Sequence, residues 1–186
     1  VAEILQYFSD DLRIRSMEAD CLYAGIMIDT NNFLTKTGVR TFEAAAFLRR
    51  CGADVTRVRK MFREHVEDYR AKGEAIRNAE LFREHFAISV CPSEGLDSPT
   101  VVGAQAANEL LNIIGVKASF VLTDYRNTIY ISARSIDEIN VQIVMERLGG
   151  GGHLNIAGAQ LEHYSITEAK DVLKQTLQKM LDEGDI

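Results

Sequence analysis

The stretch Gly149-Gly150-Gly151-Gly152-His153 is the most informative one for the fold of this chain. Four consecutive glycines have a large entropic cost when they become ordered, so such a run makes sense where the backbone must come very close to another group. Bare backbone N–H groups can line an anion site, and the imidazole that follows can add a hydrogen bond to a phosphate oxygen. A flexible linker, or a helix end followed by spare glycines, is the competing interpretation.

The surroundings of the glycine run favour the anion site over the linker. The run interrupts a domain instead of joining two domains, and it continues into the small-residue stretch 154–159, which suits tight packing behind a site. Around it, strand and helix patterns alternate, which predicts an α/β domain with a mixed sheet and helices packed on it. The expected strands are 86–91, 118–123 and 128–133, and the expected helices are 100–115, 140–148 and 166–183.

The first part of the chain has a different pattern, which is helical throughout. Helices are expected at 1–8, 16–30, 41–51 and 54–62, with a polar loop from Asp29 to Gly38. Residues 64–80 are very polar and are expected to form a solvent-exposed helix that connects two lobes. The predicted division is therefore a helical region at 1–62, a connecting helix at 63–80 and an α/β domain at 81–186.

The charge of the chain is uneven, and this restricts its partners. The formal net charge is −6. Residues 1–77 hold 13 Lys and Arg against 12 Asp and Glu, which leaves +1, and residues 78–186 hold 8 against 15, which leaves −7. Broad binding of duplex DNA needs a basic surface, so no duplex DNA is expected as a partner. An anionic ligand must be held by a few local donors instead.

Arg134 is the strongest candidate for such a donor. It follows the predicted strand 128–133, and functional side chains often emerge where strands end in α/β domains. Its guanidinium suits bidentate contact with a phosphate. The alternative is a surface ion pair with Asp137 or Glu138. Ser132 and Ser135 are weaker candidates for additional donors.

Asp29 is the candidate metal ligand of the helical region. It ends an apolar helix, where the macrodipole disfavours an anion, and a divalent cation such as Mn²⁺ or Mg²⁺ would compensate for its charge. The alternative is an aspartate that caps the turn at Asn31 or Asn32. One carboxylate cannot hold a metal, and the sequence contains neither HxxxDxD nor a DHH triplet. The remaining histidines, which have no second ligand at metal spacing, are interpreted as surface residues: His65, His85 and His163.

With these residues in hand, the chain resembles subfamily 1 of the DHH phosphoesterase superfamily, and more narrowly its GdpP-type cyclic di-AMP phosphodiesterases. The resemblance covers essentially the whole chain. The glycine-histidine run marks the DHH-associated domain, and its combination with the stretch Arg40-Thr41-Phe42-Glu43-Ala44-Ala45 is much more specific. The other matching stretches are 22–30, 32–33, 37–38, 52–54, 105–107, 118–121, 131–135 and 140–142.

The resemblance implies a function for the residues already singled out. The family holds two Mn²⁺ ions in its catalytic lobe, and Asp29 matches the last of the metal-binding aspartates. Arg134, His153 and Gly150–Gly152 match substrate-binding positions of the second domain. The reaction implied is hydrolysis of cyclic di-AMP to linear pApA, so the expected partner is cyclic di-AMP or a short linear dinucleotide. The implied location is the cytoplasm, as part of a protein anchored in the membrane.

The family's first three metal motifs are absent from this chain, so the helical region is a partial remnant of the catalytic lobe. We expect the chain to be inactive by itself and to bind few, if any, of the metals. Two other functions stay open: a hydrolase of short linear oligonucleotides such as pApA, and a non-catalytic module that binds nucleotides or forms a homodimer.

Overall fold

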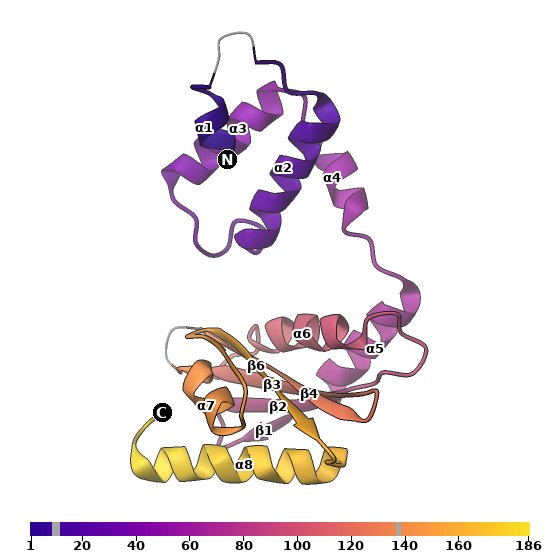
Figure 1. Ribbon diagram of the computed structural model, residues 1–186, viewed down its shortest axis with the longest axis vertical. Helices are drawn as coiled ribbons and strands as arrows, with labels where there is room; N and C mark the ends of the chain where they lie inside the picture. The colour runs from indigo at the N-terminus through magenta and orange to yellow at the C-terminus, as the bar shows by residue number, and fades with distance from the viewer. Residues whose placement is uncertain (9–11, 137–138) are drawn as a thin grey trace. The chain divides into compact units, whose positions relative to one another are not determined.

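The computed structural model describes residues 1–8, 12–136 and 139–186, and the chain divides into two compact units. The first unit is Val1–Arg63 and the second is Glu64–Ile186. Figure 1 shows helices in the first unit and a sheet with flanking helices in the second. None of the helices in the described ranges combines the length and the apolar character that a membrane span requires.

The first unit is a small helical assembly with a core made largely of alanines. Its helices are α1 (Ala2–Leu5), α2 (Ser16–Asp29), α3 (Val39–Arg50) and α4 (Val55–Met61). The buried core contains Ala2, Ala19, Ala44, Leu48 and Ala53. Because alanine side chains are short, the helices can approach each other closely, but little apolar area is buried per residue.

Asp20 joins α2 to α4 through a buried carboxylate. Its oxygens accept from the backbone N–H of Asp54 at 2.7 Å and from Nε of Arg57 at 2.6 Å. Asp54 itself caps α4, because its carboxylate accepts from the N–H groups of Thr56 and Arg57. These hydrogen bonds hold the pKa of Asp20 below its usual value, with the Arg57 side chain as the largest cause.

Helix α5 (Val66–Arg77) corrects the expectation of a solvent-exposed connector. Ala71 and Ala75 are buried in a core cluster with residues of β2 and α6, so one face of this polar helix packs inside the second unit. The contact pattern places the boundary between the units at Arg63 and Glu64, ahead of the helix. Small alanines let the helix lie close to the sheet although six of its twelve residues are charged.

The second unit is built on a mixed sheet that, within the described residues, has six strands in the order β1-β2-β3-β4-β6-β5. The predicted α/β class is confirmed. Only β2 and β3 pair in parallel, and the other neighbours are antiparallel. The strands are β1 (Glu80–Phe82), β2 (Phe86–Cys91), β3 (Ala118–Tyr125), β4 (Thr128–Ser135), β5 (Gly151–His153) and β6 (Ile156–Glu162).

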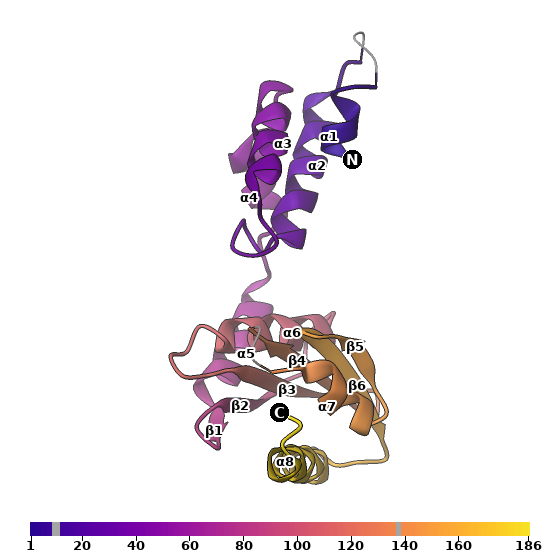
Figure 2. The same cartoon turned by 90° about the vertical axis from the view of Figure 1, so that its left-hand side faces the viewer.

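Helices cover both faces of this sheet (Figures 1 and 2). One face packs against α5 and α6 (Pro99–Leu110), and the other packs against α7 (Val141–Arg147) and α8 (Ile166–Glu183). The α7 and α8 side holds the larger core, with Phe86, Phe120 and Leu173 fully or almost fully buried. Helix α6 lies over β2, β3 and β4. The rest of the α6 face, toward β6 and β5, is where a ligand can reach the sheet.

Candidate functional site

The alternation of strand β4 separates core residues from site residues. Ile129, Ile131 and Ala133 are buried in the larger core, so the intervening Tyr130, Ser132 and Arg134 project on the opposite face, toward α6. In register with these three across the strand pair are Gln160, Gly158 and Ile156 of β6. The face beside α6 therefore carries a row of polar side chains on β4 and a glycine in the middle of β6.

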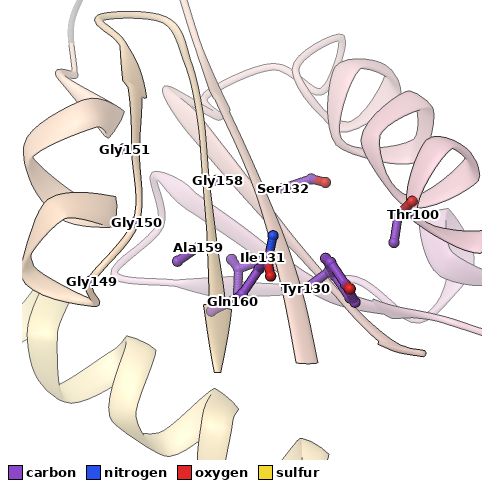
Figure 3. A pocket seen from close by; sticks show the side chains of 10 residues that line it. All are labelled: Thr100, Tyr130, Ile131, Ser132, Gly149, Gly150, Gly151, Gly158, Ala159 and Gln160. Carbon is purple, nitrogen blue, oxygen red and sulfur yellow. The ribbon is translucent and has the colours of Figure 1, made fainter. Parts of the chain in front are cut away.

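A cavity of about 550 Å³ lies on this face (Figure 3). Its size is within the range of about 300–1,000 Å³ that is usual for small-molecule sites. Figure 3 shows the side chains of Ser132 and Thr100 in the space between the strands and α6, whereas Ala159 points to the other side of the sheet. The lining residues are Thr100, Tyr130, Ile131, Ser132, Gly149, Gly150, Gly151, Gly158, Ala159 and Gln160.

The glycine run begins as a helix cap. Gly149 has φ +78 and follows the last residues of α7, and its N–H donates to the carbonyl of Glu146 at 3.0 Å. The N–H of Gly150 donates to the carbonyl of Met145 at 2.8 Å. A left-handed glycine with these two bonds is the usual way to end a helix. The interpretation of the run as a helix end is therefore right for Gly149 alone.

Gly151 and Gly152 belong to the edge strand β5, which corrects the expectation of a loop, and Gly150 directly precedes it. A Cβ on Gly150 would lie 2.1 Å from the carbonyl oxygen of Gly158, and one on Gly152 would lie 2.5 Å from Cα of Ala157. Both positions therefore require glycine because β5 lies directly against β6. A Cβ on Gly151 would meet nothing within 4 Å. Of the three glycines matched to substrate binding, only Gly151 has open space at the position of a side chain.

Arg134 is a partly buried cation that has no carboxylate partner among the described residues. Its Nε donates to Oδ1 of Asn108 at 3.1 Å, and its Nη1 donates to the carbonyl of Ala133 at 2.9 Å. Burial lowers the pKa of the Arg134 guanidinium from its usual value, because the charged form is partly desolvated. The alternative partners Asp137 and Glu138 lie outside the described residues. A phosphate would supply the counter-charge that this guanidinium lacks.

His153 lies on the same face as Arg134, two strands away. His153 is opposite Ile156 on β6, and Ile156 is opposite Arg134 on β4. Two strand spacings separate the backbones by about 10 Å. The imidazole is exposed and has no hydrogen-bond partner in the described part of the chain. The guanidinium and the imidazole are therefore on one surface, where a single anionic ligand could reach both.

The cavity divides the predicted residues and adds others. Ser132, Gly150 and Gly151 line it, and Arg134 and His153 continue the same face beyond its lining. Gly152 is in register with Ala157, whose side chain is buried in the core on the other face. Three lining residues with polar side chains were not predicted from the sequence: Thr100, Tyr130 and Gln160. Tyr130 could have been predicted, because alternate residues of a strand lie on one face and Tyr130 precedes Ser132 and Arg134 at this spacing. The other two come from elements whose position only the folded chain defines.

Asp29 is an exposed carboxylate at the end of α2, and the turn after it is closed by another residue. The N–H of Phe33 donates to Oγ1 of Thr30 at 3.0 Å, so the capping role considered for Asp29 belongs to Thr30. Among the described residues, no group of three His, Cys, Asp or Glu side chains could hold a metal ion. The described residues therefore do not form a complete metal site by themselves.

The loop after Asp29 has an unusual backbone. Asn31, Asn32 and Phe33 have φ of 46, 57 and 67. A left-handed conformation costs a residue with a side chain about 1–2 kcal/mol. The Phe33 ring stacks on Phe42 at 5.6 Å between centroids, and this packing helps to hold the strained turn.

Comparison with known proteins agrees with this geometry. Residues 85–180 match the family model described as the DHHA1 domain. The chain belongs to the DHHA1 domain family. The match covers the strands β2, β3, β4, β5 and β6 together with most of the helices on them.

The relatives of this DHHA1 protein confirm the narrower resemblance as well. GdpP of Bacillus subtilis (strain 168), named a cyclic-di-AMP phosphodiesterase, is 41% identical over 186 residues, which are 99% of this chain and 28% of that protein. PdeA of Listeria monocytogenes serotype 1/2a (strain 10403S), which has the same description, is 40% identical over 174 residues, 93% of this chain and 26% of that protein. This DHHA1 chain thus spans little more than a quarter of these relatives.

A solved structure shows the same fold. An exopolyphosphatase-related protein from Bacteroides fragilis superposes with a TM-score of 0.80 at 24% identity, over 90% of this chain and 51% of the other. At this level of identity the likeness shows that the two chains share a fold.

Proposed function

We propose that this DHHA1 chain is the substrate-binding part of a phosphodiesterase that hydrolyses cyclic di-AMP to linear pApA. The observation that supports it is the face formed by β4, β6 and β5. It presents the guanidinium of Arg134, without a carboxylate partner among the described residues, together with an exposed imidazole and the open position of Gly151. The names of the 41% and 40% identical relatives suggest the substrate.

In this proposal Arg134 binds and orients the phosphodiester. Its Nε is already held by Asn108 and its Nη1 by a backbone carbonyl, so the guanidinium is positioned before the substrate arrives. Pre-organised charge loses less entropy on binding than a mobile side chain does. His153 contacts a second phosphate oxygen from the edge strand, and Ser132, two residues before Arg134 on β4, adds a hydroxyl on the same face.

Two Mn²⁺ ions remain part of the proposal for the intact protein, where they would supply the nucleophile and stabilise the charge on the phosphate. Asp29 is the residue of this chain assigned to them. The membrane-anchored parent expected from the sequence remains a proposal too. Because this chain has no complete metal site among its described residues, its own contribution is the recognition of the substrate.

Calorimetric titration of the 186-residue chain with pApA and with cyclic di-AMP tests the proposal. Arg134→Ala is expected to weaken binding about 10- to 150-fold, the equivalent of a charged hydrogen bond of about 1.5–3 kcal/mol. Arg83→Ala is a matched control. Its Nε donates to the amide oxygen of Gln178 at 2.7 Å in the same way, but at the opposite edge of the sheet.

Equal affinities for the Arg134→Ala and Arg83→Ala variants would contradict the proposal. With the full-length protein, turnover of cyclic di-AMP that exceeds turnover of pApA supports the cyclic substrate. Preferential turnover of pApA would instead identify a hydrolase of short linear oligonucleotides, and absence of turnover with intact nucleotide binding would identify a non-catalytic module.

A further inference from the structure

The cavity is lined by four polar side chains without a hydrogen-bond partner among the described residues. They are the side chains of Thr100, Tyr130, Ser132 and Gln160. Tyr130, Ser132 and Thr100 are partly buried. Polar groups in a partly enclosed cavity are expected to bind water or a ligand. The lining contains neither a carboxylate nor a cation, so the cavity by itself suits a neutral polar group.

The aromatic residues at one end of the cavity favour a flat ligand. The Tyr130 ring lies 6.5 Å from the ring of Tyr125, and the guanidinium of Arg126 lies 4.9 Å above Tyr125. Heteroaromatic bases stack on such rings. Beside Tyr130 the floor of the cavity is bare backbone, because Gly158 of β6 and Gly151 of β5 are directly paired and neither has a side chain. A planar ring can therefore stand against the Tyr130 side chain over bare strand.

Gln160 can recognise the edge of the base. It is opposite Tyr130 in the strand pair, so its amide is beside the ring on which the base would stack. A carboxamide offers one donor and one acceptor, and this pattern matches the N7 acceptor and N6 donor of adenine. Guanine presents two acceptors on the same edge, so only one half of the amide could bond with it.

The distance from the cavity to Arg134 suits a nucleotide. Along β4, Tyr130 is four residues from Arg134, which is about 13 Å at 3.3 Å per residue. That separation is of the order of the length of a nucleoside monophosphate. Ser132 lies midway on the same face, where the ribose would be.

We infer that the cavity at Tyr130 and Gln160 is a subsite for an adenine base, whose nucleotide phosphate is held at Arg134. The base stacks on Tyr130, Gln160 binds its N6 and N7 edge, and Thr100 and Ser132 donate to the ribose hydroxyls. The inference rests on the proposed function for the phosphate, and it adds the part of the substrate that gives specificity. Ribose 5-phosphate has the phosphate and no base, so its binding tests the phosphate site at Arg134 separately from the base subsite.

The test compares AMP, GMP, ribose 5-phosphate and adenosine as ligands of the 186-residue chain by calorimetry. AMP is expected to bind about tenfold or more tightly than ribose 5-phosphate, the usual effect of one stacked base. Tyr130→Ala is expected to remove that difference, and Tyr130→Phe to keep it. Gln160→Ala is expected to bring AMP and GMP to equal affinity. Tyr69→Ala, an exposed tyrosine on α5, is the matched control.

A second readout is the NMR signal of the Gln160 side-chain amide in a ¹⁵N-labelled sample. AMP is expected to shift this signal, and ribose 5-phosphate is expected to leave it unchanged. Equal binding of AMP and ribose 5-phosphate would overturn the base subsite and leave the phosphate proposal standing. Binding of adenosine without binding of ribose 5-phosphate would overturn the phosphate proposal and leave the base subsite standing. Failure of all four ligands to bind at millimolar concentration would overturn both.

Discussion

The Nε of Arg134 on β4 donates to Oδ1 of Asn108 on α6 at 3.1 Å. A neutral amide thus fixes the direction of a guanidinium without neutralising it. Thr100 and Asn108 are both on α6, so one helix borders the cavity and orients the cation beyond it.

Asn108→Ala is predicted to weaken binding of pApA by about three- to tenfold, because it removes a hydrogen bond of about 1 kcal/mol that orients Arg134. Asn108→Asp is predicted to weaken binding more, since a carboxylate at this position competes with the phosphate for the guanidinium. Calorimetry at two salt concentrations checks both variants. A tighter complex for Asn108→Asp than for the parent chain would contradict this role.

Gly150→Ala and Gly151→Ala are predicted to have opposite effects. The added methyl at Gly150 would overlap the backbone of Gly158 and Ala159, so the free energy of unfolding of the second unit should fall by about 1–3 kcal/mol or more. The methyl at Gly151 meets open space, so stability should change little while nucleotide affinity falls, because the methyl enters the cavity. Urea unfolding and AMP titration separate the two effects. Unchanged AMP affinity in Gly151→Ala would count against the cavity as the binding site.

Gly103 and Thr123 are predicted to be energetically coupled. A Cβ on Gly103 of α6 would lie 2.4 Å from Oγ1 of Thr123 on β3. Gly103→Ala should therefore destabilise the second unit by about 1–3 kcal/mol. The double variant with Thr123→Ala should recover part of that loss, because the obstructing hydroxyl is gone. A double-mutant cycle measured by urea unfolding checks this, and additive effects would show that the two residues are independent.

Asp20→Asn is predicted to destabilise the first unit at neutral pH only. The pKa of Asp20 is lowered in the folded state by Arg57 and by the N–H of Asp54. The unfolded chain therefore binds the proton more tightly, and the stabilisation is present above the ordinary aspartate pKa of about 3.9. It is lost as the pH falls through the lower, folded value. Unfolding curves at neutral and acidic pH test this, with the exposed Glu43→Gln as control. A difference from the parent chain that persists at low pH would refute it.

Secondary-structure elements with a clear hydrophobic pattern were predictable from the sequence. Elements that form only against a neighbouring strand were not. The strand Phe86–Cys91 has the predicted bounds, because five of its six residues are apolar. The alternation of Thr128–Ser135 was readable in the same way. Glu80–Phe82 and Gly151–His153 are short edge strands. Gly151–His153 contains two glycines, which have low strand preference, and Glu80–Phe82 has only three residues, so each extends because a neighbouring strand is available.

The candidate site shows the same division. Arg134, Ser132 and His153 could be selected from residue type and position, because guanidinium, hydroxyl and imidazole groups suit a phosphate wherever the fold brings them together. Thr100 and Gln160 carried no such signal. They are ordinary polar residues until α6 and β6 place them around one cavity.

The sequence by itself determined the α/β class, the family resemblance and the chemistry that Arg134 and His153 can perform, because these depend on local pattern and residue type. Only the tertiary structure decided what each glycine does. Gly149 ends α7, Gly150 and Gly152 let the chain lie against β6, and Gly151 lines the cavity with open space at the position of a side chain. The physical reason is that steric exclusion depends on which backbone lies opposite. Identical glycines therefore acquire different functions only when their neighbours are in place.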